Sequence, residues 1–264
     1  MKEKNSKDLF FELVKTNFKI RYNNSVLGFL WVLLKPFLTF VIMYVVWTAF
    51  RGERAQNYQV YLLLGVILFT FVNEGIVLGM NGLLDKAHII LKVNFDRQIA
   101  VLSSVAMSII NLCINLVIFF IFALFNPINP SFVGVVFFLI TIAIAIFIMY
   151  SLNLFLSIML IKLRDLQHIF ELFFQLLFWV TPIFYSIDEL GGDIGNIISL
   201  NPLGMLIRIA RQSLIEGEIS TILIWQTQVS SIYIVAIASL FGLVIFLLGR
   251  IYFKNEVRKV AEYF

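Results

Sequence analysis

The chain has 264 residues and a formal net charge of +4. Hydrophobic residues make up 61% of it and charged residues 14%, against about 45–50% and about 25% in ordinary soluble domains. This composition excludes a soluble globular domain and indicates an all-α integral membrane protein, because the apolar runs are continuous whereas membrane strands alternate in pieces of roughly ten residues.

Residues 1–25 form the first predicted element, an amphipathic helix on the cytoplasmic surface of the membrane. Apolar residues recur there at roughly helical spacing, and basic residues supply the charged side: Lys4, Lys7, Lys15, Lys19 and Arg21. The segment is polar and basic and lacks the short apolar run of a cleavable signal peptide. We therefore expect an interface helix, followed by one transmembrane domain over 26–264.

Six apolar stretches then predict six transmembrane helices, because about 20 apolar residues cross a hydrocarbon core. The centre of the chain is the clearest case. Residues 98–161 contain no Asp, Glu, Lys or Arg, and the sequence NPINPS at 126–131 is typical of a tight turn between two spans. Lys35–Pro36 is expected to interrupt the first span. The predicted spans are 26–50, 58–84, 99–125, 131–161, 166–185 and 219–249.

The distribution of positive charge predicts the orientation. Fifteen of the 20 Lys and Arg residues fall in segments 1–25, 85–98, 162–165 and 250–264, four fall in the alternate loops, and Lys35 lies within the first span. Basic residues concentrate on the cytoplasmic side of membrane proteins. Both termini, and the tail at 250–264, are therefore expected in the cytoplasm, and the charge is not read as a sign of nucleic-acid binding.

The segment 186–218 predicts two short helices that dip into the outer leaflet and return. Its uncharged stretch is too short to span, and Gly191, Gly192, Gly195 and Asn201–Pro202 divide it. Broken helices at membrane depth require protein or a water-filled cavity around their backbone. An ordinary helix on the outer surface is the alternative.

Enzymatic signatures are absent from the sequence. It has no phosphate-binding loop of the G-x-x-x-x-G-K-[ST] type, so we expect no ATP site and no catalytic residue in this chain. His88 and His168 lack metal-ligand spacing, so no metal is expected. Glu74 and Glu171 lie near the cytoplasmic ends of their spans, which favours helix pairing or a pore mouth over a proton relay.

Aromatic residues near the outer ends of spans 1 and 5 can point into the bundle, where their flat faces would stack on apolar faces of a ligand. They are Tyr44, Trp47, Phe178, Trp179 and Tyr185. The alternative is the interfacial belt that Trp and Tyr form at the ends of membrane spans.

Several short motifs, in order along the chain, resemble ABC-2-type permeases that export cell-surface polysaccharides. These motifs are Ile20–Tyr22, Ser25–Trp31, Leu34–Pro36, Val93–Phe95, Arg164–Asp165, Trp179–Tyr185 and Asn201–Leu203. Asp96 departs from the pattern, because the family often has Pro after Asn-Phe.

The resemblance implies a homodimer in a bacterial cytoplasmic membrane, paired with two copies of a cytoplasmic ABC ATPase that would bind ATP and Mg. The substrate would be a lipid-linked polysaccharide of the O-antigen (lipopolysaccharide), rhamnan or teichoic-acid type. The loop 85–98 would dock on the ATPase through Asp85, Lys86, Ile89, Ile90, Leu91 and Lys92. The segment 186–218 would form outer gate helices, with Asn201, Pro202, Arg208 and Arg211 as gate residues, and spans 1 and 5 would line the channel.

Two other classes remain open. A proton-coupled secondary transporter would need carboxylates near mid-membrane and inverted repeats, which the sequence does not show. A membrane-embedded enzyme that modifies glycans would need a paired acidic or His/Asp site, for which Asp165 with His168 is the nearest candidate.

Overall fold

The computed structural model describes residues 2–22, 28, 30–51, 57–93, 95–126, 128–190, 192–219, 221–225 and 227–259. The first half of the chain forms α1 (Lys2–Tyr22), α2 (Leu30–Arg51), α3 (Tyr58–Asn81), α4 (Ala87–Ile90), α5 (Gln98–Ala123) and α6 (Phe132–Lys162). The second half forms α7 (Leu166–Val180), α8 (Ile187–Leu190), α9 (Gly192–Ser199), α10 (Pro202–Arg211), a π-helical turn (Gln212–Glu216), β1 (Thr221–Ile224), β2 (Thr227–Ser230) and α11 (Ser231–Glu256).

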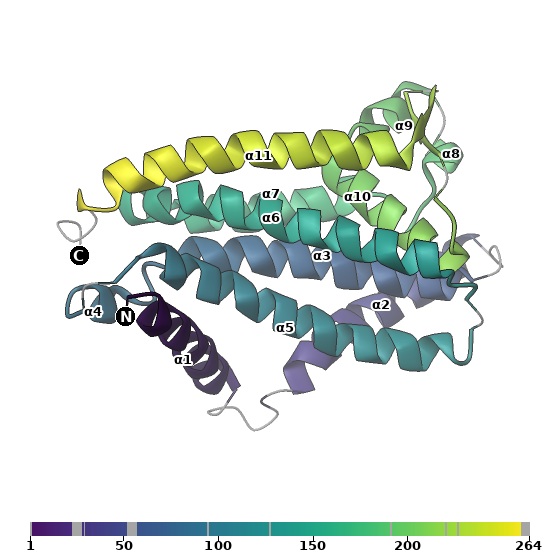
Figure 1. The fold of residues 1–264 in the computed structure, drawn as a ribbon. Coiled ribbons are helices and arrows are strands. Elements are labelled where there is room, and N and C mark those ends of the chain that lie inside the picture. Colours follow the sequence, from purple (N-terminus) through teal and green to yellow (C-terminus); the bar gives the residue numbers. More distant parts are fainter. Residues whose placement is uncertain are drawn as a thin grey trace.

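The fold is a bundle of long helices that run beside one another (Figure 1). Within the described ranges, α2, α3, α5, α6 and α11 are long and apolar enough to cross a membrane, and α7 is a shorter apolar helix. The described chain ends lie at the same end of the bundle, which we call the terminal end; the opposite end is the hairpin end (Figure 1). The expected all-α membrane fold is confirmed.

Helix α3 is the centre of the packing. It contacts α5, α6, α2, α10 and α7, whereas α11 packs mainly against α6. Small residues allow these close approaches, because a Cβ added at Gly79 would lie 2.1 Å from the side-chain nitrogen of Asn153 on α6. Such glycines let helices in a membrane come together.

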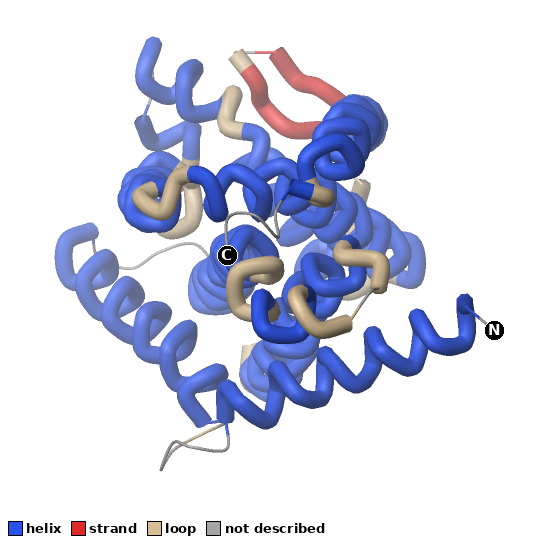
Figure 2. The backbone as a smooth tube through the Cα atoms, turned by 90° about the vertical axis from the view of Figure 1, so that its left-hand side faces the viewer, coloured by secondary structure: helices blue, strands red, loops and turns tan. Residues whose placement is uncertain are grey.

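The surface helix α1 lies against the bundle rather than apart from it. Leu13 is buried, and the Asn17 side chain donates a hydrogen bond of 3.5 Å to the Ser103 carbonyl on α5. Viewed along the bundle from the terminal end, α1 crosses obliquely beside the other helices, and the strands lie at the far margin (Figure 2). The last turn of α1 therefore reaches toward the interior of the bundle.

The central spans match their expected bounds closely. Helix α6 begins after Ser131, whose hydroxyl accepts a hydrogen bond of 2.9 Å from the Gly134 amide, and it ends at Lys162. Pro127 of the predicted turn lies outside the described residues, as do Gly191, Asn94 and the loop residues 52–56. The expected interruption at Lys35–Pro36 does not end α2, which continues through Pro36 to Arg51.

Two expected boundaries were wrong. Span 5 was expected to reach 185, but α7 ends at Val180, because Thr181 precedes a proline and takes the extended conformation that this position favours. Span 6 was expected to begin at 219, but residues 221–224 and 227–230 pair as antiparallel strands and α11 begins at Ser231. The hairpin turns at Trp225, which has a positive φ of 47°.

The segment between α7 and β1 was expected to form two short helices, but its described residues form three, α8, α9 and α10, and a π-helical turn. Helix α10 packs directly on α3 and α6. In Figure 1, α9, α8 and the hairpin lie beside the first turns of α11. The segment therefore belongs to the bundle, and its entry into the outer leaflet stays a prediction.

Candidate functional site

A cavity of about 480 Å³ lies between α2, α3 and α7, with the last turn of α1 at its margin. The volume is in the range of ordinary ligand pockets. Its walls contain side chains from four separate elements, and the helical rise of about 1.5 Å per residue orders those of α3 and α7 in three levels.

The first level is charged. Lys35 on α2, Glu171 on α7 and Glu74 on α3 all line the cavity. Glu74 and Glu171 lie roughly 8 to 10 Å from the ends of α3 and α7 that face the terminal end of the bundle, whereas α2 begins part-way along the bundle (Figure 1). Arg21 of α1 also lines the cavity and forms an ion pair of 3.5 Å with Glu74. Two cations and two carboxylates therefore line the cavity, and we call these four residues its charged level.

The next levels carry no charge. Hydroxyl and amide side chains come first, at roughly 12 to 16 Å along the helices, and aromatic rings follow at roughly 18 to 20 Å. The polar residues are Thr39, Thr70, Asn73 and Gln175, and the aromatic residues are Phe69, Phe178 and Trp179. This part of the wall can stack on flat apolar faces and hydrogen-bond to hydroxyl groups.

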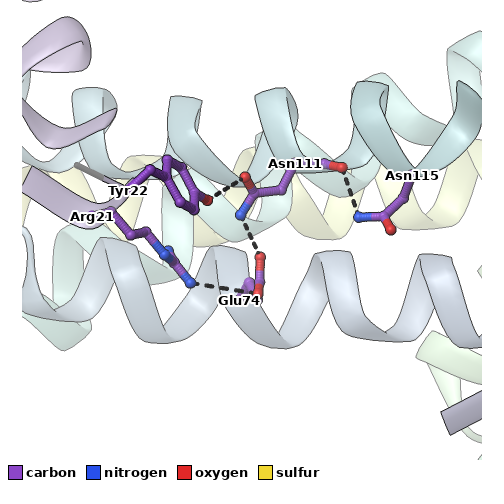
Figure 3. Close-up of polar contacts among 5 residues, drawn as sticks. All are labelled: Arg21, Tyr22, Glu74, Asn111 and Asn115. Atoms are coloured by element: carbon purple, nitrogen blue, oxygen red, sulfur yellow. Dashed lines mark hydrogen bonds and ion pairs between the residues drawn. The ribbon is translucent and has the colours of Figure 1, made fainter. Parts of the chain in front are cut away.

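A polar network holds Arg21 and Glu74 in place (Figure 3). The Asn111 amide donates a hydrogen bond of 2.7 Å to Glu74, and the Tyr22 hydroxyl donates one of 2.9 Å to the Asn111 oxygen. The Asn115 amide donates to the Asn111 carbonyl one turn away on α5. The network joins α1, α3 and α5, so the carboxylate of Glu74 has a firm position in the wall.

Beyond the aromatic level, a cluster of rings surrounds the buried side chain of Phe184. Phe178 and Trp179 approach it with centroid distances of 6.0 and 5.5 Å, and Trp47 stacks on it at 4.8 Å. Tyr185 contacts it edge-on at 5.0 Å. Four of the five predicted channel residues therefore meet at Phe184, which the sequence analysis did not single out. Of the five, only Phe178 and Trp179 are among the residues lining the cavity.

Tyr44 and Tyr185 have clear structural contacts. The Tyr44 hydroxyl accepts a hydrogen bond of 2.6 Å from Gln59. The Tyr185 hydroxyl donates to the carbonyls of Trp179 and Val180, at 3.2 and 3.0 Å, and so caps the last turn of α7. Their channel role stays a prediction, and Trp179, at 51% exposure, remains the best placed of the aromatic residues.

The outer residues Asn201 and Pro202 begin helix α10. The Asn201 oxygen accepts hydrogen bonds from the Leu203 and Gly204 amides, and Pro202 takes the first helical position, where its missing N–H costs nothing. The Asn201 amide donates a hydrogen bond of 3.0 Å to the Thr181 hydroxyl. The start of α10 is thus tied to the point where α7 ends.

Arg211 secures the other end of α10. Its guanidinium donates hydrogen bonds of 3.0 and 2.8 Å to the carbonyls of Pro182 and Ile183, and it lies 6.0 Å from the centre of the Tyr61 ring. Burial lowers the pKa of Arg211 to about 10, so it stays charged at neutral pH. A Cβ at Gly65 would lie 1.5 Å from the guanidinium, so this glycine makes its space.

Arg208 faces a different neighbour, because its guanidinium donates a hydrogen bond of 3.1 Å to the Leu223 carbonyl of the hairpin. Together, Asn201, Arg208 and Arg211 hold the short helices to α7, α3 and β1. The four predicted gate residues thus form the framework of the outer segment, and their role in opening it stays a prediction.

The predicted docking segment contains both buried and exposed residues. Lys86 is 3% exposed and donates a hydrogen bond of 2.7 Å to the Ser104 hydroxyl, and burial lowers its pKa to about 8. Ile90 is 6% exposed in a cluster with Leu83 and Ala100. These two predicted docking residues therefore pack inside the chain. The exposed residues of this segment are Asp85, His88, Leu91, Lys92, Val93 and Asp96, and Ile89 is partly exposed.

The charged level of the cavity was only partly visible in the sequence. Glu74 and Glu171 stand out as acidic residues in apolar spans, and the expectation of helix pairing or a pore mouth fits both. Lys35 was noted only as an interruption of the first span. The pairing of Arg21 with Glu74 joins residues far apart in the chain, and no local pattern indicates it.

Comparison with known proteins places the chain among transporters. Residues 8–215 match the family described as ABC-2 type transporter. Two proteins of Klebsiella pneumoniae, each named O-antigen export system permease protein RfbA, are both 27% identical to it, one over 81% of this chain and 82% of its own length and the other over 90% and 91%. A protein of the same name from Myxococcus xanthus is 25% identical over 74% of this chain and 75% of its own length.

Proposed function

Because the chain belongs to the ABC-2 type transporter family, we propose that it is the membrane subunit of an ATP-driven exporter for a lipid-linked cell-surface polysaccharide. The similar proteins are named O-antigen export permeases, which supports an O-antigen-like or related glycan, such as a rhamnan or teichoic acid, as the substrate. The chain is a multi-pass protein of a bacterial membrane and a transporter subunit rather than an enzyme.

The observation that carries this proposal is the uncharged part of the cavity wall. Hydroxyl, amide and aromatic side chains follow one another along α2, α3 and α7. A sugar chain presents hydroxyl groups and flat C–H faces at every residue, so such a wall can contact it in many registers without gripping one of them. Trp179 is half exposed beside the Phe184 cluster, and it is the residue that we most expect to contact the glycan.

A second copy of the chain completes the path in this proposal. The residues of α2 contribute polar groups to the cavity, yet only 11% of the most apolar window of α2 is buried. Polar groups at membrane depth need protein or water around them. A homodimer in which α2 and α7 of each copy face a shared channel satisfies that need.

Two copies of a separate cytoplasmic ATPase would supply the energy, binding ATP and Mg themselves. The terminal end of the bundle would face the cytoplasm, in line with the excess of Lys and Arg there. The ATPase would dock on the exposed part of the 85–93 segment, where Leu91 and Val93 are 54% and 52% exposed beside charged residues. An exposed apolar patch rimmed by charge is typical of an interaction surface.

Deletion of the gene tests the function directly. Lipid-linked glycan should accumulate on the cytoplasmic side and disappear from the cell surface, and the wild-type gene on a plasmid should restore it. Surface glycan at the normal level in the deletion strain would reject the proposal.

A biochemical test addresses the energy source. The purified chain alone should hydrolyse no ATP, and hydrolysis and transport should appear together when the ATPase subunit is added. Transport by the purified chain without any ATPase would show that another energy source drives it.

A further inference from the structure

Lys86 is a buried cation that joins the start of the predicted docking segment to α5. Its ammonium group donates hydrogen bonds of 2.7 Å to the Ser104 hydroxyl on α5 and of 3.5 Å to the Gly82 carbonyl at the end of α3. The Ser104 hydroxyl donates in turn to the Ala100 carbonyl, at 3.2 Å. A charge that is withdrawn from water depends on its hydrogen-bond partners. Lys86 therefore fixes the place of the docking segment relative to α5.

Glycines bring α3 and α5 into close contact beyond this point. A Cβ added at Gly79 would lie 2.9 Å from the Val105 side chain, and one added at Gly75 would lie 3.0 Å from the Ser108 hydroxyl. Close-packed protein interiors have low compressibility and transmit strain. We therefore expect α3 and α5 to move as one body.

The other end of this contact reaches the cavity. Asn111 lies two helical turns beyond Ser104 on α5, roughly 10 Å along the helix, and its amide donates a hydrogen bond of 2.7 Å to Glu74. Glu74 lines the cavity. The Tyr22 hydroxyl donates to Asn111 at 2.9 Å, so the last turn of α1 is held at the same point. A continuous connection therefore runs from the docking segment to one wall of the cavity.

Helices α2 and α7 form the other walls of the cavity. Helix α2 is packed more loosely than α3, because 11% of its most apolar window is buried against 67% in that of α3. A displacement of α3 and α5 relative to α2 and α7 would change the width of the cavity.

We propose that Lys86 is the positioning residue that makes the docking segment, α5 and Glu74 move together, so that a displacement of this segment by the ATPase reaches the cavity wall. Asn111 transmits the movement to Glu74 and to α1. The role in export rests on the proposed function, whereas the rigid attachment of the docking segment to α5 does not. Because a coupling route requires a measured interaction between its members, the tests address Lys86 and Ser104 together.

Spin labels test the attachment in the full-length chain in nanodiscs of phosphatidylcholine. The labels are placed at the exposed positions Leu91, in the docking segment, and Val117 on α5, in a chain whose Cys113 is changed to Ser. Double electron–electron resonance should give one narrow distance distribution in the chain that keeps Lys86, and a clearly broader one in Lys86→Met. A narrow distribution in Lys86→Met would overturn the proposal.

Two serine variants separate the bond from a general change in packing. Ser104→Ala removes the acceptor of Lys86 and should broaden the same distribution. Ser103→Ala is the matched control, because Ser103 is equally buried and its hydroxyl donates to the Ala100 carbonyl of its own helix; it should leave the distribution narrow. Replacement of a buried charge by an apolar side chain of similar size often leaves stability unchanged or raises it, so Lys86→Met should not lower the temperature of thermal unfolding.

Export measured against ATP hydrolysis tests the role in transport, in the complex with the ATPase. Lys86→Met and Ser104→Ala should each lower the glycan exported per ATP hydrolysed several-fold, while the ATPase still co-purifies. The double variant should lose no more than the more affected single variant, because both changes remove the same bond. Additive losses, or a normal ratio in Lys86→Met, would overturn the proposal. Loss of the ATPase from Lys86→Met would overturn it as well, because Lys86 would then belong to the docking surface.

The failure of this proposal and that of the proposed function give different results. Normal surface glycan after gene deletion would reject the function, and the spin-label distances would still decide whether Lys86 attaches the docking segment to α5. Normal export by Lys86→Met, when gene deletion abolishes export, would reject the role of Lys86 alone.

Discussion

Helices α3 and α2 are almost equally apolar, with mean hydropathies of 2.1 and 1.9, yet they occupy opposite environments. In the most apolar window of α3, 67% of the residues are buried, and in that of α2, 11%. Glycines make the difference at α3, where Gly65, Gly75 and Gly79 leave no room for a side chain. Helix α2 has no glycine. Hydropathy therefore identifies membrane helices, whereas small residues indicate which of them the other helices surround.

Helices α3 and α2 also belong to two regions with different proposed functions. The α3 core, meaning α3 with the helices packed on it, fixes the fold. The α2–α7 face, meaning the half-exposed helices α2 and α7, provides half of the residues that line the cavity, and α3 provides most of the others. Substitutions in the first region should act on stability, and substitutions in the second on transport.

The largest effect is expected from a side chain forced into the α3 core. Gly79→Val would push its first side-chain atom against Asn153 and Val105, which should cost about 3 kcal/mol by overpacking. We expect loss of monodisperse protein in size-exclusion chromatography in detergent. Ala49→Val, an exposed position of α2, is the matched control. Equal behaviour of the two variants would contradict the division into two regions.

Gly65 and Arg211 test the core in a second way. Arg211→Ala should cost roughly 2–4 kcal/mol, because the carbonyls of Pro182 and Ile183 lose their donors. Gly65→Ala should be costly as well, since its new methyl group meets the guanidinium. In the double variant the clash is gone. Its loss of stability in thermal unfolding should therefore be smaller than the sum of the losses in the two single variants. Strict additivity would mean that the guanidinium does not occupy the space at Gly65.

The α2–α7 face is tested by Trp179→Ala. Half of this side chain is exposed, so the variant should fold normally while export falls several-fold, and Trp179→Phe should retain most of the activity because stacking needs a flat ring. Surface glycan is the measurement, and Leu176→Ala, another exposed position of α7, is the control. If position 179 reacts only with lipid-soluble labels after change to Cys, the interfacial-belt interpretation holds instead.

The smallest effect is expected in the docking segment, where the adjacent residues Ile90 and Leu91 differ in exposure. Leu91→Asp, at an exposed position, should weaken co-purification of the ATPase about tenfold or more without lowering the thermal stability of the chain. Ile90→Asp should instead destabilise the chain itself, because its carboxylate would be buried without a partner. Normal ATPase retention by Leu91→Asp would exclude this segment as the docking surface.

The sequence predicts the central helices well because charged residues bound them on both sides. Helices α5 and α6 fill the charge-free run, and they begin and end within one or two residues of the expected positions. The same rule fails at 221–230, because the apolar residues Ile222, Leu223 and Ile224 look like the start of the following membrane helix but form a strand of a hairpin. The family resemblance is confirmed by the match over residues 8–215.

The candidate site is less predictable because it is assembled across the bundle. Lys35, Glu74 and Glu171 come from three helices, and none of them shows by spacing which face it presents. The burial of Ile90 and Lys86 likewise depends on α5, which follows them in the chain. Local patterns predict helices, but the neighbours of each face depend on packing between distant segments.

The 15 residues of α7 have one further consequence. At about 1.5 Å per residue the helix is roughly 22 Å long, which is shorter than a hydrocarbon core of about 30 Å. For α7 to serve as the predicted fifth span, the lipid beside it would have to thin, or the turn at Thr181 would have to enter the acyl chains, and both arrangements cost energy that depends on lipid length. Bilayer thickness would thus affect the junction between the end of α7 and the start of α10. Export should be faster in membranes of short-chain lipids than in thick ones, so the composition of the host membrane becomes a regulator of the transporter.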